Sequence, residues 1–136
     1  MSSTALEYHL RQLLADNPSI QDRVADRITA LVRDEDGAFP AIVYQSSKPV
    51  REKDLDGELS DIGTLVMAFE VWANTYSSAK LIAADIIAEL ENFSGEFPGY
   101  QVSNIDVEQT DEDGDDENRL YVIDLVATVV FKYVVQ

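Results

Sequence analysis

The sequence predicts a single α+β domain, in which a mainly antiparallel sheet carries two principal helices and ends in a long C-terminal strand. Two segments, 64–73 and 119–135, alternate apolar and polar residues with the period of a β-strand. Between them, segment 79–93 repeats its apolar residues at helical spacing. The chain has 136 residues, the usual size of one domain.

The N-terminal region predicts a first helix of about three turns. Thr4 and Glu7 have the spacing of a capping box, and leucines follow at helical intervals. Pro18 cannot continue the helical hydrogen-bond ladder, so the helix is expected to end before it. Ser19 is expected to cap a further short turn.

Two short strands and a polar stretch come next. Residues 27–32 predict a first strand and 34–37 its turn, and 40–45 predict a second, β-rich strand opened by proline. The polar segment 46–62 alternates charged and apolar residues. We expect it to form either a long surface loop or a projecting hairpin arm.

The strand 64–73 places Phe69 and Trp72 on opposite faces. We expect Phe69 to pack beneath the helix 79–93, and Trp72 to lie on the other face, against the first helix or a neighbouring subunit. The strand that follows the helix, 100–110, can run in either direction.

The C-terminal half predicts a hairpin with an acidic turn. Residues 111–118 contain six carboxylates around Gly114, which we expect at the hairpin tip. The following strand is long for a domain of this size, so we expect it to contain a bulge or to pair partly with another subunit. The predicted core comprises Leu10, Leu13, Phe69, Ile82, Ile86, Leu90, Ile123, Leu125 and Phe131.

The net charge of −16 argues against direct nucleic-acid binding, because the ten Lys and Arg residues are scattered along the chain. Two interpretations of this charge remain: solubility, including adaptation to a salt-rich habitat, or a surface that lies near DNA without binding it. In the second case the carboxylates are candidates for a channel lining or a docking interface. They are Glu52, Asp54, Asp56, Glu58, Asp111, Glu112, Asp113, Asp115, Asp116 and Glu117.

No residue pattern predicts an enzyme, a cofactor or a metal site. The chain lacks cysteine and has one histidine, His9, which we expect to be structural. Asp111 opens a segment that resembles a calcium loop, but positions six and twelve hold Asp116 and Val122 instead of glycine and a carboxylate. A weak, nonspecific cation site is the alternative interpretation. No apolar stretch reaches the length of a membrane span, and the N-terminus lacks the pattern of a secretion signal.

The order of these segments resembles the phage tail-completion (tail-terminator) family. The resemblance lies in the leucine-rich first helix, Asp26-Arg27-Ile28, the strand Phe39-Pro40-Ala41-Ile42-Val43-Tyr44, and the run from Phe69 through Trp72 to Lys80. It spans nearly the whole chain. The charged segments 46–62 and 111–118 depart from it.

The resemblance implies a structural virion protein of the head-proximal tail end or neck, assembled in the host cytoplasm. Its partners would be further copies in a ring, with a hexamer expected, the tail tube protein and a head-completion or stopper protein, while DNA passes through without specific binding. The alternatives are another neck, connector or minor tail subunit, or an acidic module that mimics DNA.

Overall fold

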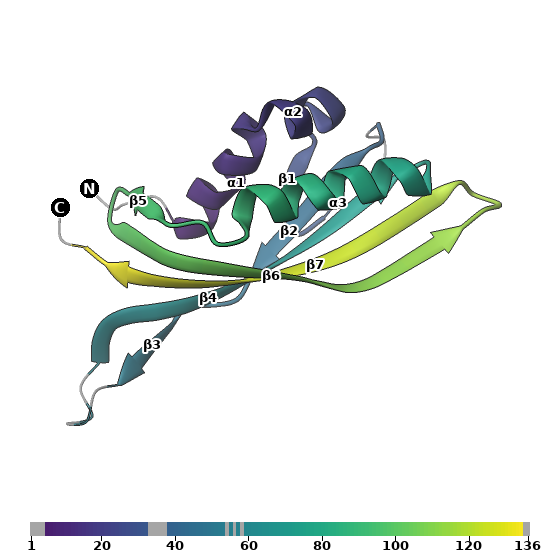
Figure 1. The fold of residues 1–136 in the computed structure, drawn as a ribbon. Coiled ribbons are helices and arrows are strands. Elements are labelled where there is room, and N and C mark those ends of the chain that lie inside the picture. Colours follow the sequence, from purple (N-terminus) through teal and green to yellow (C-terminus); the bar gives the residue numbers. More distant parts are fainter. Residues whose placement is uncertain (1–4, 33–37, 54, 56, 58, 135–136) are drawn as a thin grey trace.

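A computed structural model describes residues 5–32, 38–53, 55, 57 and 59–134, and is the structure discussed below. Seven strands form one sheet in the order β1-β2-β4-β7-β6-β5, with β3 also paired to β4. All pairs are antiparallel except β1 with β2. The three helices among the described residues all lie on one face of this sheet (Figure 1). The predicted α+β class is therefore confirmed.

The first two helices confirm the expected three-turn helix that ends before Pro18 and show the further short turn as a second helix. α1 spans Leu6–Asp16 and α2 spans Pro18–Val24. Pro18 occupies the first turn of α2, where its missing N–H removes no hydrogen bond, and the Asn17 side chain accepts from Ser19 N and Ile20 N. The expected cap at Ser19 is thus wrong, because Asn17 performs it. The expected capping box rests on Thr4, which lies outside the described residues; among those described, Ala5 is the N-cap of α1 and makes no side-chain bond.

The strands that follow differ from expectation mainly at their ends. β1 spans Ile28–Ala30 and β2 spans Ala41–Ser46, while the expected turn at 34–37 lies outside the described residues. β3 spans Val50–Lys53 and β4 spans Leu59–Ala73, so segment 46–62 is a hairpin arm instead of a loop. β2 and β3 pair with successive parts of β4. Figure 1 shows the β3–β4 arm projecting beyond the rest of the sheet.

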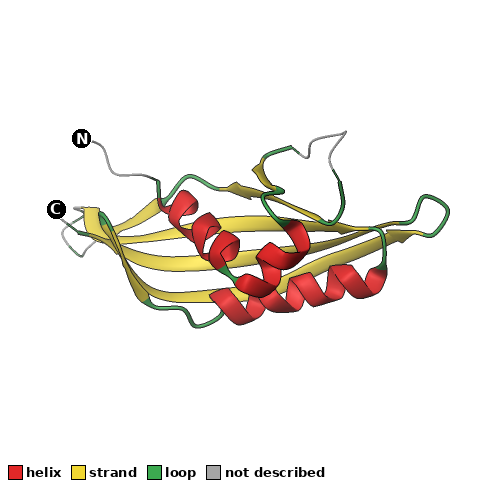
Figure 2. Cartoon of the chain, turned by 90° about the horizontal axis from the view of Figure 1, so that it is seen from above, coloured by secondary structure: helices red, strands yellow, loops and turns green. Residues whose placement is uncertain are grey.

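The long helix α3 spans Tyr76–Leu90 and is capped by Thr75, whose side chain accepts from Ser78 N. It begins and ends three residues earlier than 79–93. A short strand that the sequence did not predict, β5 at Gly95–Phe97, pairs with β6. In Figure 2, α3 runs along the sheet beside α1 and α2.

The last two strands form the largest hairpin of the fold. β6 spans Tyr100–Asp115 and β7 spans Leu120–Tyr133, and β6 runs antiparallel to β7. The acidic segment is therefore not a turn from 111 to 118: residues 111–115 continue β6, and Gly114 pairs with Tyr121 instead of forming the tip. The bulge that was expected in β7 occurs instead in β6, the strand with which β7 pairs. The register of β6 shifts near Ser103 and again near Thr110.

The core lies between the sheet and the helices. Alternate residues of β4 and β7 face the helices and are buried, and Phe69 is fully buried in one cluster with Ile82, Ile86 and Leu90 of α3. Trp72 is half-buried and alternates with the buried Val71 and Ala73, so it lies on the face opposite Phe69, as expected. Because α1 packs on the same face as α3, the expected contact of Trp72 with α1 is wrong, and a contact with a neighbouring subunit stays a prediction. Of the nine expected core residues the structure buries eight, and Leu13 is half-buried at the edge of the cluster.

Candidate functional site: two acidic regions

Two acidic regions of the described chain differ in their surroundings. The first, called here the acidic hairpin, consists of residues 111–117 at the β6–β7 end. The second, called here the acidic groove, lies on the helix-free face of the sheet and contains Glu70 and Asp124. The other expected site residues are in the β3–β4 arm, where Glu52 is exposed on β3, and Asp54, Asp56 and Glu58 lie outside the described residues.

In the first part of the acidic hairpin, side chains satisfy the backbone of β6. Asp111 Oδ1 accepts from Glu112 N, and Asp113 Oδ1 accepts from Gly114 N, each at 2.9 Å. On the same strand, Glu91 accepts from Val107 N at 2.6 Å. An open sheet edge offers unpaired amides to other strands, so these bonds close part of the β6 edge.

The remaining carboxylates of the hairpin stabilise its turn and attach it to α3. Asp115 accepts from Glu117 N, Asn118 N and Asn118 Nδ2, and Asp116 accepts from the Tyr121 hydroxyl. These bonds to Asn118 and Glu117 lower the pKa of Asp115, and the bond from Tyr121 to Asp116 raises the pKa of the Tyr121 hydroxyl.

Glu112 connects the hairpin to α3. Its Oε2 lies 3.1 Å from Lys80 Nζ, and the Tyr76 hydroxyl and Gln109 Nε2 donate to the same carboxylate at 3.0 Å. The Lys80 and Tyr76 side chains lower the pKa of Glu112, and the Glu112 carboxylate raises the pKa of Lys80. The hairpin is thus an internally hydrogen-bonded structure, and it is not an array of unpaired charges.

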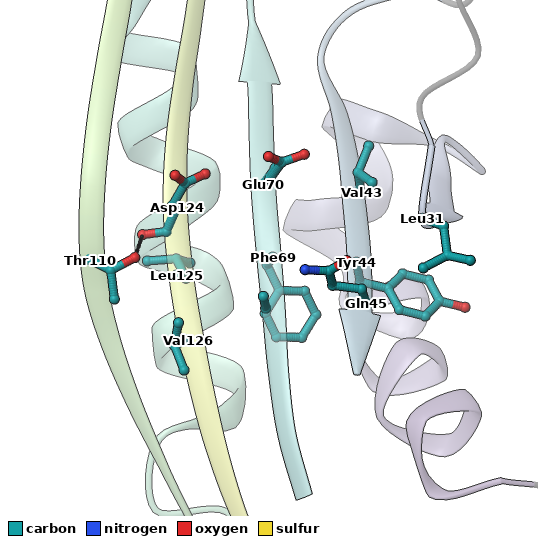
Figure 3. A pocket seen from close by; sticks show the side chains of 11 residues that line it. Leu31, Val43, Tyr44, Gln45, Phe69, Glu70, Thr110, Asp124, Leu125 and Val126 are labelled. Carbon is teal, nitrogen blue, oxygen red and sulfur yellow. Dashed lines mark hydrogen bonds between the residues drawn. The ribbon is translucent and has the colours of Figure 1, made fainter. Parts of the chain in front are cut away.

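The acidic groove has the opposite character. Antiparallel pairing places Val43, Glu70, Asp124 and Asp111 in one row across β2, β4, β7 and β6. Figure 3 shows the Glu70 and Asp124 carboxylates side by side on neighbouring strands. Like charges directly opposite each other in a sheet are destabilising.

The groove has a volume of about 330 Å³ and lies on the sheet surface beside this row. Ala68 has a small side chain between its neighbours in the register, Gln45 and Val126, which leaves room for the hollow. Leu31 and Val43 border the groove on the side of β1 and β2. The hollow therefore combines aliphatic surfaces with two carboxylates.

Asp124 is the most perturbed group of the groove. Its Oδ1 is shielded from water and has no hydrogen-bond partner, although the side chain as a whole is only half-buried. This desolvation raises its pKa, and the negative charges of Glu70, Asp111 and Asp113 raise it further. Sequence reasoning missed both residues, because each occupies an ordinary polar position of an alternating strand and only the strand register brings them together.

The structure assembles no group of three or more His, Asp or Glu side chains that is suited to a metal ion, as far as the described residues extend. His9 lies among aromatic rings: its ring stacks on Phe97 with centroids 5.0 Å apart, and its Nε2 is buried without a partner. Of the helices that the structure describes, none is long and apolar enough to span a membrane.

The described residues form an α+β domain with a long sheet, helices on one face of it, and two projecting hairpins. Comparison with known proteins specifies this class. Residues 9–132 match the family described as tail completion protein gp17. The fold is similar to that of a chain in the solved virion of a native gene transfer agent (GTA) particle, with a TM-score of 0.76 over 94% of this chain and 95% of that one, at 15% sequence identity. No curated protein matches the chain.

The chain belongs to the tail completion protein gp17 family. It is therefore a structural protein of a phage-type tail.

Proposed function

We propose that the chain forms a ring, with six copies, that ends the tail tube at its head-proximal end and joins it to the head-completion or stopper protein. DNA passes through this ring, and the chain performs no catalysis. The observation that carries the proposal is the family match over residues 9–132. The bare sheet face supports it, since it leaves Val66 and Ile62 about 40% exposed, where a neighbouring copy can cover them.

Charge sets the conditions for such a ring. Six copies of net charge −16 sum to roughly −96, so DNA is repelled wherever carboxylates face the channel. The same charge opposes association of the copies at low salt, because screening lengths are then long. Ring formation therefore requires contacts that bring opposite charges together or bury apolar surface.

The proposal is tested by deleting the gene that encodes this chain from the genome that produces the particle, and by supplying the gene again in trans. Without the protein we expect tails of uncontrolled length that fail to join heads, and with it normal particles. Negative-stain images and native mass spectrometry of the purified chain then show whether it forms rings, alone or on tube ends. Normal joined particles without the protein would contradict the proposal.

A further inference from the structure

The two acidic regions differ in whether they need a partner. In the hairpin, backbone amides and the Lys80, Tyr76 and Tyr121 side chains already contact the carboxylates. In the groove, Asp124 Oδ1 has no partner, and Glu70 accepts only a long bond from Trp72 Nε1 at 3.4 Å. Within the described part of the chain, no cation pairs with either groove carboxylate. The groove therefore holds two neighbouring carboxylates, one of them with an oxygen shielded from water, that no cation of the described chain compensates.

The shape of the groove favours one kind of chemical group as the partner that neutralises the charge of Glu70 and Asp124. A long aliphatic stem fits against Ala68, Val126 and Val43, and a cationic head then reaches Glu70 and Asp124. Lysine and arginine have this construction, with methylene groups that bury and a charge that pairs. A simple metal ion fits less well, since the described carboxylates do not converge as metal ligands do.

The chain itself carries basic side chains on β3 and just before it, a segment called here the base of the β3–β4 arm. Lys48, Arg51 and Lys53 are exposed within six residues, the densest group of basic residues in the chain, and the exposed Glu52 is the one acidic residue among them. Arg51 Nη2 lies 3.6 Å from Asp61, with its guanidinium over the Tyr133 ring, and its side chain is 37% exposed. The arm projects beyond the rest of the sheet (Figure 1), so its side chains are accessible to another molecule.

We propose that the acidic groove is the docking site for a second copy of this chain, which inserts a basic side chain from the base of its β3–β4 arm between Glu70 and Asp124. Groove and arm are different surfaces, so each copy offers a groove to one neighbour and an arm to the next. Such head-to-tail contacts close into rings when the rotation per copy permits. This inference rests on the proposed ring function and supplies its contact between copies.

Cysteine cross-linking tests the contact directly, because the chain has no cysteine of its own. One variant carries Gln45→Cys at the groove together with Glu52→Cys on β3, which leaves the proposed cations in place. Gln45 pairs with Ala68 of β4, whereas Glu52 lies between residues that pair with Gly63 and Leu59. The two positions are therefore too far apart to be cross-linked within one chain. The matched control replaces Gln45→Cys with Leu81→Cys, exposed on the helix-covered face. We expect a short bismaleimide to yield dimers and higher multimers only for the groove pair.

Charge reversal tests the chemistry of the contact in the full-length chain. Glu70→Lys, or Arg51→Glu with Lys53→Glu, is expected to reduce the yield of cross-linked multimers at least about tenfold, and the combined variant to restore it. Melting curves establish that each variant remains folded, and Glu70→Gln, which keeps the shape of the side chain, is expected to cause a smaller loss.

The outcomes separate the inference from the proposed function. Rings in micrographs with equal cross-linking of the groove and control pairs would overturn the inference and leave the ring function intact. Loss in both single reversals without rescue in the combined variant would show that the groove and the arm do not contact each other, and would also overturn it. Absence of rings, free or on tube ends, would instead remove the proposed function.

Discussion

The acidic hairpin and the acidic groove contain the same chemical group in opposite situations. In the hairpin, carboxylates accept from the amides of Glu112, Gly114, Glu117 and Asn118, and so they organise the backbone. In the groove, Glu70 and Asp124 lie opposite each other on neighbouring strands, and partial burial together with the charge of Glu70 raises the pKa of Asp124. A dense run of charge in a sequence thus need not be the part that seeks a partner.

The core beneath the sheet holds the strands of the groove in place, and substitution in that core should cause the largest loss of stability. Phe69 is fully buried between Ala68 and Glu70 on β4, in contact with the core beneath the groove. Phe69→Ala should lower the free energy of unfolding by about 3–5 kcal/mol, because the cavity left in a packed core adds to the lost transfer energy. Chemical denaturation measures the loss. Leu81→Ala, on the exposed side of α3, is the control with an expected loss below about 1 kcal/mol.

His9 tests whether any buried polar atom without a partner marks a contact site. Its Nε2 resembles Asp124 Oδ1 in lacking a partner, but its surroundings are the rings of Phe97, Tyr8 and Tyr100 instead of carboxylates. His9→Gln should cost about 0.5–1.5 kcal/mol of stability through the lost ring stacking. Ring formation and infectious particle yield should be unchanged, and loss of particles from a folded variant would contradict a structural role.

Substitution of Asp124 should change the stability in the opposite direction from the two substitutions above. Because its folded pKa is raised, the folded state binds a proton more tightly than the unfolded chain, and the ionised carboxylate is destabilising at neutral pH. Asp124→Asn should therefore stabilise the isolated chain by about 0.5 kcal/mol at pH 7, after allowance for solvent screening.

The pH dependence checks the cause of that gain. The contribution of Asp124 to stability falls as pH rises from the unfolded pKa of an aspartate, about 3.9, through its raised folded value. The gain from Asp124→Asn should therefore disappear below about pH 4. Asp106→Asn, an exposed carboxylate on β6, is the control; a gain that persists at low pH in Asp124→Asn would show that charge is not the cause.

Local patterns predicted the parts of this fold that depend on one segment at a time. The alternation in 64–73 and 119–135 predicted which residues of β4 and β7 face the core, and the helical spacing predicted the face of α3. The family resemblance also came from these segments, and the match over residues 9–132 confirms it. The expected tube, head and ring contacts remain predictions.

Properties that depend on pairing did not follow from the sequence. The register that places Glu70 opposite Asp124, and the shift at Thr110 that carries β6 through the acidic run, are set by contacts between distant segments. The turn signal at Gly114 misled for the same reason, since paired strands continue past it to Asp115. The density of charge in the sequence therefore indicated the acidic hairpin as the candidate site, whereas Glu70 and Asp124, which no described cation pairs with, lie in the groove.

The smallest expected effect belongs to the acidic hairpin itself. Asn and Gln keep the carbonyl oxygen that accepts from backbone amides but remove the charge. Replacing Asp113, Asp115, Asp116 and Glu117 by Asn or Gln should therefore leave the fold and its melting temperature almost unchanged. The matched Ala set removes the acceptors as well, so the amides of Gly114, Glu117 and Asn118 should exchange hydrogen faster there.

Assembly then decides what the hairpin charge does. A channel or docking role predicts that the Asn/Gln set causes defects in DNA passage or head joining that depend on salt, because ions screen exposed charges. Full infectivity of that set at low and high salt would assign the charge to solubility. If the Ala set alone is defective, the carboxylates act through the backbone that they hold, as their hydrogen bonds to Gly114 and Asn118 indicate.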